Sequence, residues 1–111
     1  MEDQTKLPPP PEEMQTNAMH AAAFLKTLAH EGRLMILCHL GSSEKSVGEL
    51  EELLGIRQAA VSQMLARLRE EGLVTTRRDG KTIYYSLAND NTSRVIGLLY
   101  DIFCAQPDGG C

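Results

Sequence analysis

The chain has no tryptophan, and only three tyrosines and two phenylalanines occur among its 111 residues. Aliphatic side chains must therefore build most of its core. No apolar run approaches the roughly 20 residues that a membrane-spanning helix needs, so a transmembrane segment is excluded. The N-terminus lacks the basic start and the apolar stretch of a secretory signal, and we expect the protein to stay in the cytoplasm.

Cysteine is also scarce, with single residues at positions 38, 104 and 111. An odd and sparse set argues against the disulfide scaffold of a secreted protein, and the absence of a CxxC pair argues against a zinc knuckle. The sequence has no paired acid and base and no phosphate-binding loop, so we predict neither an enzyme nor a bound cofactor. The cysteines leave room for regulatory thiols.

The formal net charge is −4, but the charge is unevenly distributed. Between positions 57 and 81 there are six basic and three acidic residues, whereas the rest of the chain holds five basic and twelve acidic residues. A polyanion responds to the local charge of one face rather than to the sum, so this basic segment remains compatible with nucleic-acid binding.

The length favours one domain, which we place at residues 13–105 between a disordered Pro-rich tail (1–12) and a flexible tail (106–111). A domain this small is often only marginally stable as a monomer, so we expect the protein to self-associate. Apolar spacing and breakers predict helices over 13–28, 33–40, 46–54 and 58–71 and a last helix from Asn89 or Asn91 to Phe103. Two β-rich runs, 73–78 and 81–87, flank Asp79-Gly80, a strong hairpin signal.

This order of elements predicts a mainly α fold, an α+β winged helix-turn-helix with about five helices and one β-hairpin wing. The second helix of the motif is expected to face the DNA major groove. Its predicted exposed residues are Gln58, Ala59, Ser62, Gln63, Met64, Arg67 and Arg69. Glutamine can bond adenine through two hydrogen bonds and serine can bond several base edges. Arg57 and Arg67 are better suited to phosphates, and so are Arg77, Arg78 and Lys81 at the hairpin tip.

The runs TLAHEGRLMILCHL, AVSQMLARLREEGLV and RDGKTIYYSL resemble the ArsR/SmtB family of repressors over residues 18–104. The resemblance implies a homodimeric winged-helix repressor that dimerises through its terminal helices, here about 14–28 and 90–104. It also implies binding to an inverted-repeat operator in double-stranded DNA, and release by a chemical inducer.

Many members of the family sense metals, but both usual ligand sets are missing here. One set is a CxC pair at the start of the motif, where this chain has Ser46 and Gly48. The other uses Asp and His on the last helix, which here contains no His. Soft metals need thiolate or imidazole ligands, so we predict no such metal site.

Cys38 and Cys104 resemble the thiol pair of the sulfide- and persulfide-responsive branch of the family. The resemblance implies a persulfide or polysulfide inducer that joins the two thiols within one subunit. We expect a polysulfide bridge rather than a disulfide if the thiols lie further apart than a disulfide allows. The open alternative is a Zn or Cu response through the same cysteines, with help from His39 or Cys111.

Overall fold

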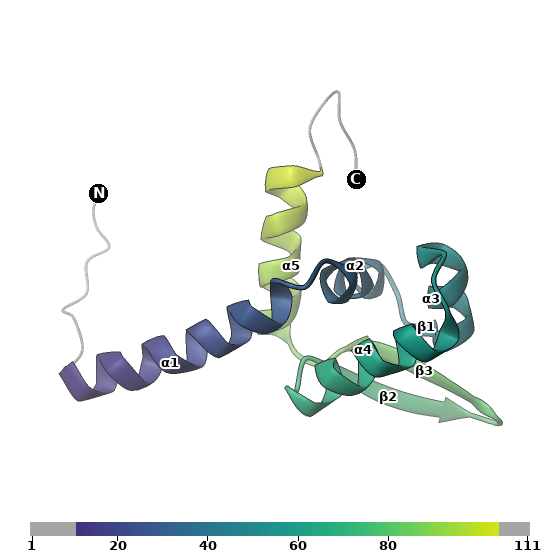
Figure 1. Cartoon of the computed structure of the whole chain (residues 1–111), viewed down its shortest axis with the longest axis horizontal. Coiled ribbons are helices and arrows are strands. Elements are labelled where there is room, and N and C mark those ends of the chain that lie inside the picture. The colour runs from purple at the N-terminus through teal and green to yellow at the C-terminus, as the bar shows by residue number, and fades with distance from the viewer. Residues whose placement is uncertain (1–10, 105–111) are drawn as a thin grey trace.

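The structure, a computed structural model, describes residues 11–104 and contains the predicted five helices and hairpin (Figure 1). In chain order the elements are α1 (Pro11–Leu28), α2 (Glu31–Leu40), β1 (Lys45–Ser46), α3 (Val47–Leu54), α4 (Gln58–Glu70), β2 (Val74–Asp79), β3 (Thr82–Leu87) and α5 (Asp90–Phe103). The winged helix-turn-helix fold predicted from the element order is therefore confirmed.

Two helices start two residues earlier than the sequence predicts. Helix α1 begins at Pro11, so the expected tail is wrong for residues 11 and 12. Proline suits the first position of a helix, because that position needs no N–H donor. Helix α2 begins at Glu31, where the Nδ1 atom of His30 accepts a hydrogen bond from the backbone N–H of Arg33 at 3.2 Å. Residues 1–10 and 105–111, including Cys111, lie outside the described residues.

Helix α2 lies at the centre of the fold and packs against α1, α3, α4, α5 and β3. Its Ile36 and Leu37 side chains have no exposed surface. The core around it combines aliphatic residues from almost every element, as the lack of aromatic residues predicts: Leu28, Leu40, Leu50, Val61, Leu65, Leu68, Leu73, Val74 and Ile96.

Local signals set the geometry of the helix-turn-helix. The hydroxyl of Ser46 accepts a hydrogen bond from the N–H of Glu49 at 3.2 Å, and the Glu49 carboxylate accepts one from the N–H of Ser46 at 2.8 Å. This reciprocal pair is the capping box that the S-x-x-E spacing predicts. Gly55 ends α3 with φ of 68°, a left-handed conformation that glycine adopts without strain, and the chain turns directly into α4.

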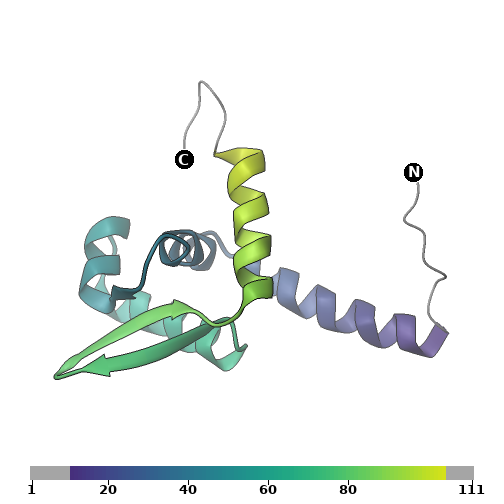
Figure 2. The ribbon, with the colours of Figure 1, turned by 180° about the vertical axis from the view of Figure 1, so that it is seen from behind.

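The sheet has three antiparallel strands in the order β1-β3-β2. Strands β2 and β3 form the wing, closed by the pair Asp79 and Thr82 around the two-residue loop Gly80-Lys81. Strand β1 pairs Lys45 and Ser46 with β3. The sequence analysis predicted no strand there, because two residues are too few to show a strand period. Seen from behind, the wing and α1 extend to opposite sides of the molecule (Figure 2).

We predict that Ser46→Ala lowers the free energy of unfolding by about 1 kcal/mol, because α3 loses its capping oxygen. Ser46→Asn, which keeps an accepting oxygen, should leave it nearly unchanged. Urea unfolding followed by circular dichroism measures both variants. Equal loss in the two variants would show that the cap contributes nothing and that packing at Ser46 matters instead.

Candidate functional site

The N-terminal half of α4 presents a polar surface. Val61, Leu65 and Leu68 are fully buried on one face of this helix. The opposite face leaves the predicted base-contacting residues exposed: Gln58, Ala59, Ser62 and Gln63. Arg57 precedes the helix as its N-cap residue, is exposed, and makes no side-chain capping hydrogen bond. A helix held by its apolar face and free on its polar face can enter a DNA major groove.

Met64 was expected among these exposed residues, and that expectation is wrong. Its side chain is half-buried and packs against the core cluster. A Cβ added at Gly32 would lie only 2.6 Å from the Met64 sulfur, so α2 and α4 approach closely at this point. The helical spacing alone did not reveal this contact, because it depends on a glycine 32 residues earlier in the chain.

Arg67 and Arg69 lie at the C-terminal end of α4, and both are exposed. The Arg67 Nε atom donates to Glu71 Oε2 at 3.2 Å, one turn further on. This pair is solvent-exposed, and such pairs are weak, so a phosphate can replace the carboxylate. Arg67 remains a predicted phosphate contact on these grounds.

The wing carries three of the predicted basic residues, but they differ in their surroundings. Arg78 and Lys81 are exposed near the hairpin tip. Arg77 instead forms two hydrogen bonds with the carboxylate of Glu44, one of them from Nε to Oε1 at 3.1 Å. Its guanidinium also lies over the Tyr84 ring, 4.9 Å from the centroid. Arg77 therefore ties the wing to the loop that follows α2, a role that the sequence prediction missed.

In the Glu44–Arg77 pair, each side chain stabilises the charged form of the other. Hydrogen bonding from Arg77 lowers the pKa of Glu44, and hydrogen bonding to Glu44 raises the pKa of Arg77. Both groups therefore stay ionised across the neutral range. The partners are 33 residues apart, so no periodicity in the sequence indicates their contact.

The two predicted sensor cysteines lie on helices that pack against each other. Cys38 lies on α2, is half-buried, and carries a free thiol. Burial raises its pKa. Cys104 caps the C-terminal end of α5 and is buried; it belongs to a disulfide bond in which the free Cys38 takes no part.

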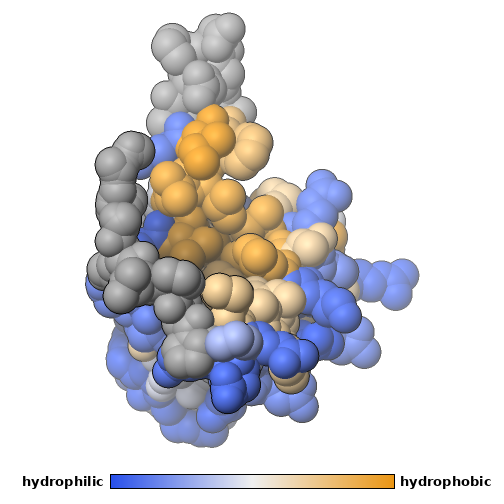
Figure 3. Space-filling model, turned by 90° about the vertical axis from the view of Figure 1, so that its left-hand side faces the viewer, coloured by the Kyte–Doolittle hydropathy of each residue, from blue (hydrophilic) through white to orange (hydrophobic). Residues whose placement is uncertain are grey.

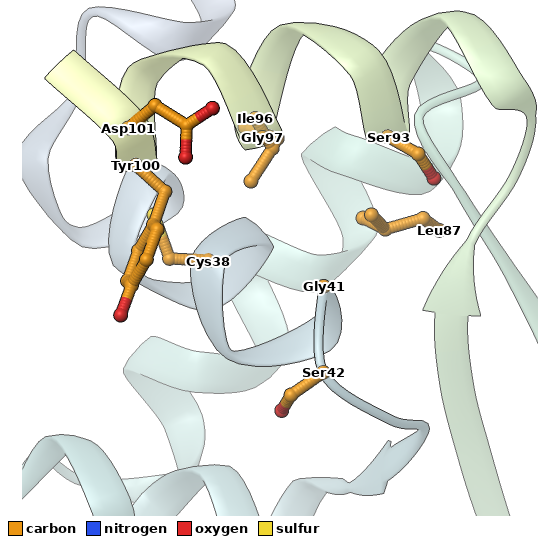
Figure 4. A pocket seen from close by; sticks show the side chains of 9 residues that line it. All are labelled: Cys38, Gly41, Ser42, Leu87, Ser93, Ile96, Gly97, Tyr100 and Asp101. Carbon is orange, nitrogen blue, oxygen red and sulfur yellow. The ribbon is translucent and has the colours of Figure 1, made fainter. Parts of the chain in front are cut away.

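A pocket of about 420 Å³ lies between α2, α5 and the end of β3, and Cys38 is part of its wall (Figure 4). Figure 4 shows Cys38 of α2 and Tyr100 of α5 on the same side of this pocket. The lining residues are Cys38, Gly41, Ser42, Leu87, Ser93, Ile96, Gly97, Tyr100 and Asp101. The structure therefore gives one of the two thiols access to a cavity large enough for a small molecule.

Residues 11–104 contain no group of three or more His, Cys, Asp and Glu side chains placed to hold a metal ion. Within the same residues, no helix is both long enough and apolar enough to cross a bilayer.

Comparisons with known proteins agree on one family. Residues 30–76 match a model described as bacterial regulatory protein, arsR family. The biofilm growth-associated repressor of Agrobacterium fabrum is 53% identical over 95 residues, which cover 86% of this chain and 81% of that protein.

Two solved structures share the fold. The repressor BigR from Xylella fastidiosa is 46% identical, with a TM-score of 0.80, over 91% of this chain and 100% of that one. Reduced HlyU from Vibrio cholerae is 44% identical, with a TM-score of 0.81, over 84% of this chain and 98% of that one.

We predict that Gln63→Ala and Arg78→Ala weaken DNA binding in different ways. Gln63→Ala should cost about 1–3 kcal/mol on a specific site and little on random DNA, because we expect Gln63 to contact a base. Arg78→Ala should weaken binding to both alike and flatten the salt dependence, because we expect Arg78 to contact a phosphate. Fluorescence anisotropy titrations at several salt concentrations separate the two. A change confined to specific DNA for both variants would contradict the assignment of the wing.

The Glu44–Arg77 pair makes a further prediction. If Arg77 acts by positioning the wing, Glu44→Gln should weaken DNA binding in the same direction as Arg77→Ala, within about fivefold for an exposed pair. If Arg77 contacts phosphate directly, Glu44→Gln should instead strengthen binding, because it frees a cation. We expect the first result, measured by the same titrations with Glu52→Gln as a control for the lost charge.

Proposed function

Because this chain belongs to the arsR family of bacterial regulatory proteins, we propose that it is a transcriptional repressor released from its operator by reactive sulfur species. The name of the Agrobacterium relative, a repressor 53% identical to this chain, supports the first half of the proposal. The relatives are transcriptional regulators and not enzymes, which agrees with the sequence prediction.

The DNA-binding half of the proposal requires a dimer. Apolar side chains remain exposed on α1 and α5: Met14, Met19, Leu25, Leu98, Ile102 and Phe103. Phe103 is 71% exposed and Leu98 is 58% exposed. Apolar residues gather on the face from which α1 extends, above all along α5 (Figure 3). We propose that a second copy covers this surface, so that two α4 helices meet an inverted repeat.

The sulfur-sensing part of the proposal rests on the position of Cys38. Its thiol is free and lines a pocket whose other wall is α5, and Cys104 is the C-cap residue of α5. A reactive thiol needs access for its reagent, and Cys38 has it. Once the Cys104 disulfide is reduced, a second thiol becomes available on the helix that faces Cys38.

The proposed chemistry begins with sulfur transfer to Cys38. The Cys38 thiolate attacks the outer sulfur of a persulfide RSSH, forms Cys38–S–SH, and releases the thiol RSH. If the Cys104 thiolate then attacks the sulfur bonded to Cys38 Cβ, the products are a disulfide and hydrogen sulfide. Alternatively, two further RSSH molecules first add two more sulfurs and give Cys38–S–S–S–SH. The Cys104 thiolate then attacks the third sulfur from Cys38, expels hydrogen sulfide and leaves a tetrasulfide. A tetrasulfide spans a wider gap than the roughly 7 Å between Cα atoms that a disulfide tolerates.

The switch follows from the location of the bridge. Helix α2 packs against both α4 and α5. A bond between α2 and the end of α5 therefore constrains the helix on which the DNA-contacting helix rests. A change of about 1.4 kcal/mol in the relative stability of the DNA-bound arrangement weakens operator binding tenfold.

We predict that an organic persulfide converts the reduced protein to a form that has lost two thiols and gained two sulfur atoms. Intact mass spectrometry and thiol titration follow the reaction. Cys38→Ser and Cys104→Ser should each abolish the bridge, whereas Cys111→Ser should retain it. A wild-type mass that does not change would contradict the proposal. Tight stoichiometric binding of Zn(II) or Cu(I) in equilibrium dialysis would favour the metal alternative.

The raised pKa of Cys38 gives a pH prediction. Because burial favours the neutral thiol, the reactive thiolate is a minor form at pH 7 and increases as the pH rises toward the pKa. Alkylation of Cys38 by iodoacetamide in the reduced protein should therefore accelerate about tenfold per pH unit from pH 7 to pH 8. Peptide mass spectrometry measures the rate at Cys38 itself. A rate that is already constant over this interval would show a lowered pKa.

A further inference from the structure

The pocket beside Cys38 has walls suited to the carbon part of a sulfur donor. Leu87 and Ile96 supply apolar surface from β3 and α5. Gly97 leaves its side of the pocket open, since a Cβ built on it meets no atom within 4 Å. The volume of about 420 Å³ is within the usual range for small-molecule sites. A persulfide with a short organic group can therefore place that group in the pocket while its sulfur reaches Cys38.

The residues that line the pocket include one acidic side chain and no Lys, Arg or His. The acidic side chain is that of Asp101 on α5. Figure 4 shows its carboxylate on the same wall as Tyr100. Lys45 lies outside the lining and is hydrogen-bonded to one lining residue, Ser42. Its ammonium already donates to His39 O at 3.2 Å, Ser42 Oγ at 3.3 Å and Ser43 Oγ at 2.7 Å. A negative donor would therefore meet a carboxylate and no lining cation.

The attacking group adds to this effect. Cys38 must be a thiolate when it attacks the outer sulfur of RSSH, and the products are Cys38–S–SH and the thiolate RS⁻, which takes up a proton. Repulsion between a carboxylate on R and the two anions of the site raises the energy of the encounter. A cationic group on R is attracted by both.

We infer that this pocket selects small organic persulfides that are uncharged or cationic, and that Asp101 is the residue that discriminates against anionic donors. The inference rests on the proposed function, because it specifies the donor for the same thiol. It requires that the carbon part of the donor occupy the pocket during sulfur transfer.

The test compares the persulfides of cysteamine, 2-mercaptoethanol and 3-mercaptopropionate, which are similar in size and whose carbon groups carry a positive, zero and negative charge. Second-order rates of sulfur addition to Cys38 are measured on the reduced full-length protein at low salt by peptide mass spectrometry. Asp101→Asn should accelerate the anionic donor about fivefold, slow the cationic donor by a similar factor, and leave the neutral donor unchanged. Glu52→Gln removes one negative charge on α3 and should leave all three rates unchanged.

A second variant tests occupancy. Gly97→Leu places a side chain in open space on a helix, and it should slow the three organic donors severalfold while sparing hydrogen disulfide, which has no carbon part. Equal slowing of all four donors would overturn the inference, and so would Asp101→Asn rates that do not depend on donor charge. If no donor adds sulfur to wild-type Cys38, the proposed function itself fails. If all donors react but without charge preference, only this inference fails.

Discussion

The burial of α2 is the constraint on which the rest of this molecule depends. Ile36 and Leu37 are wholly enclosed, and the helix that carries them packs against four other helices. Cys38 follows directly after Leu37, so the thiol that we propose as the sulfur acceptor is attached to this central, buried helix. Close-packed interiors do not deform smoothly. A covalent constraint on α2 must therefore be relieved by movement of its neighbours, and α4 is one of them.

The same helix also connects the thiol site to the wing. The loop after α2 contains Glu44, which holds Arg77, and it leads into β1, which pairs with β3. Ser46 at the end of this loop caps α3. A single short segment therefore positions the wing and the start of the helix-turn-helix. Six of the eleven Lys and Arg residues lie between positions 57 and 81, in the second helix of the motif, the turn before it and the wing, although the net charge of the chain is −4.

The sequence predicted the features that depend on near neighbours. Ser46 and Glu49 are three residues apart, Gly55 ends its own helix, and Asp79-Gly80 lies at the turn of its own hairpin. In each case the residues that interact are close neighbours in the sequence. The apolar spacing of α4 likewise predicted which face is buried.

Features that depend on distant residues were not predictable in this way. The contact of Met64 with Gly32, the pairing of Arg77 with Glu44 and the short strand β1 all join segments far apart in the sequence. The pocket beside Cys38 is of the same kind, since α2, β3 and α5 each supply part of it. Such features arise only when the helices pack, and a periodic pattern in one segment carries no information about its partner.

The central claim is that joining Cys38 to Cys104 weakens operator binding, and the most direct measurement is the operator affinity of the purified bridged protein. An operator selected from random DNA by the reduced protein would serve as the ligand. We expect affinity about 30-fold lower for the bridged form, equivalent to about 2 kcal/mol of coupling. Cys38→Ser treated with the same persulfide should keep the affinity of the reduced protein. Equal affinity of the bridged and reduced wild-type proteins would contradict the account.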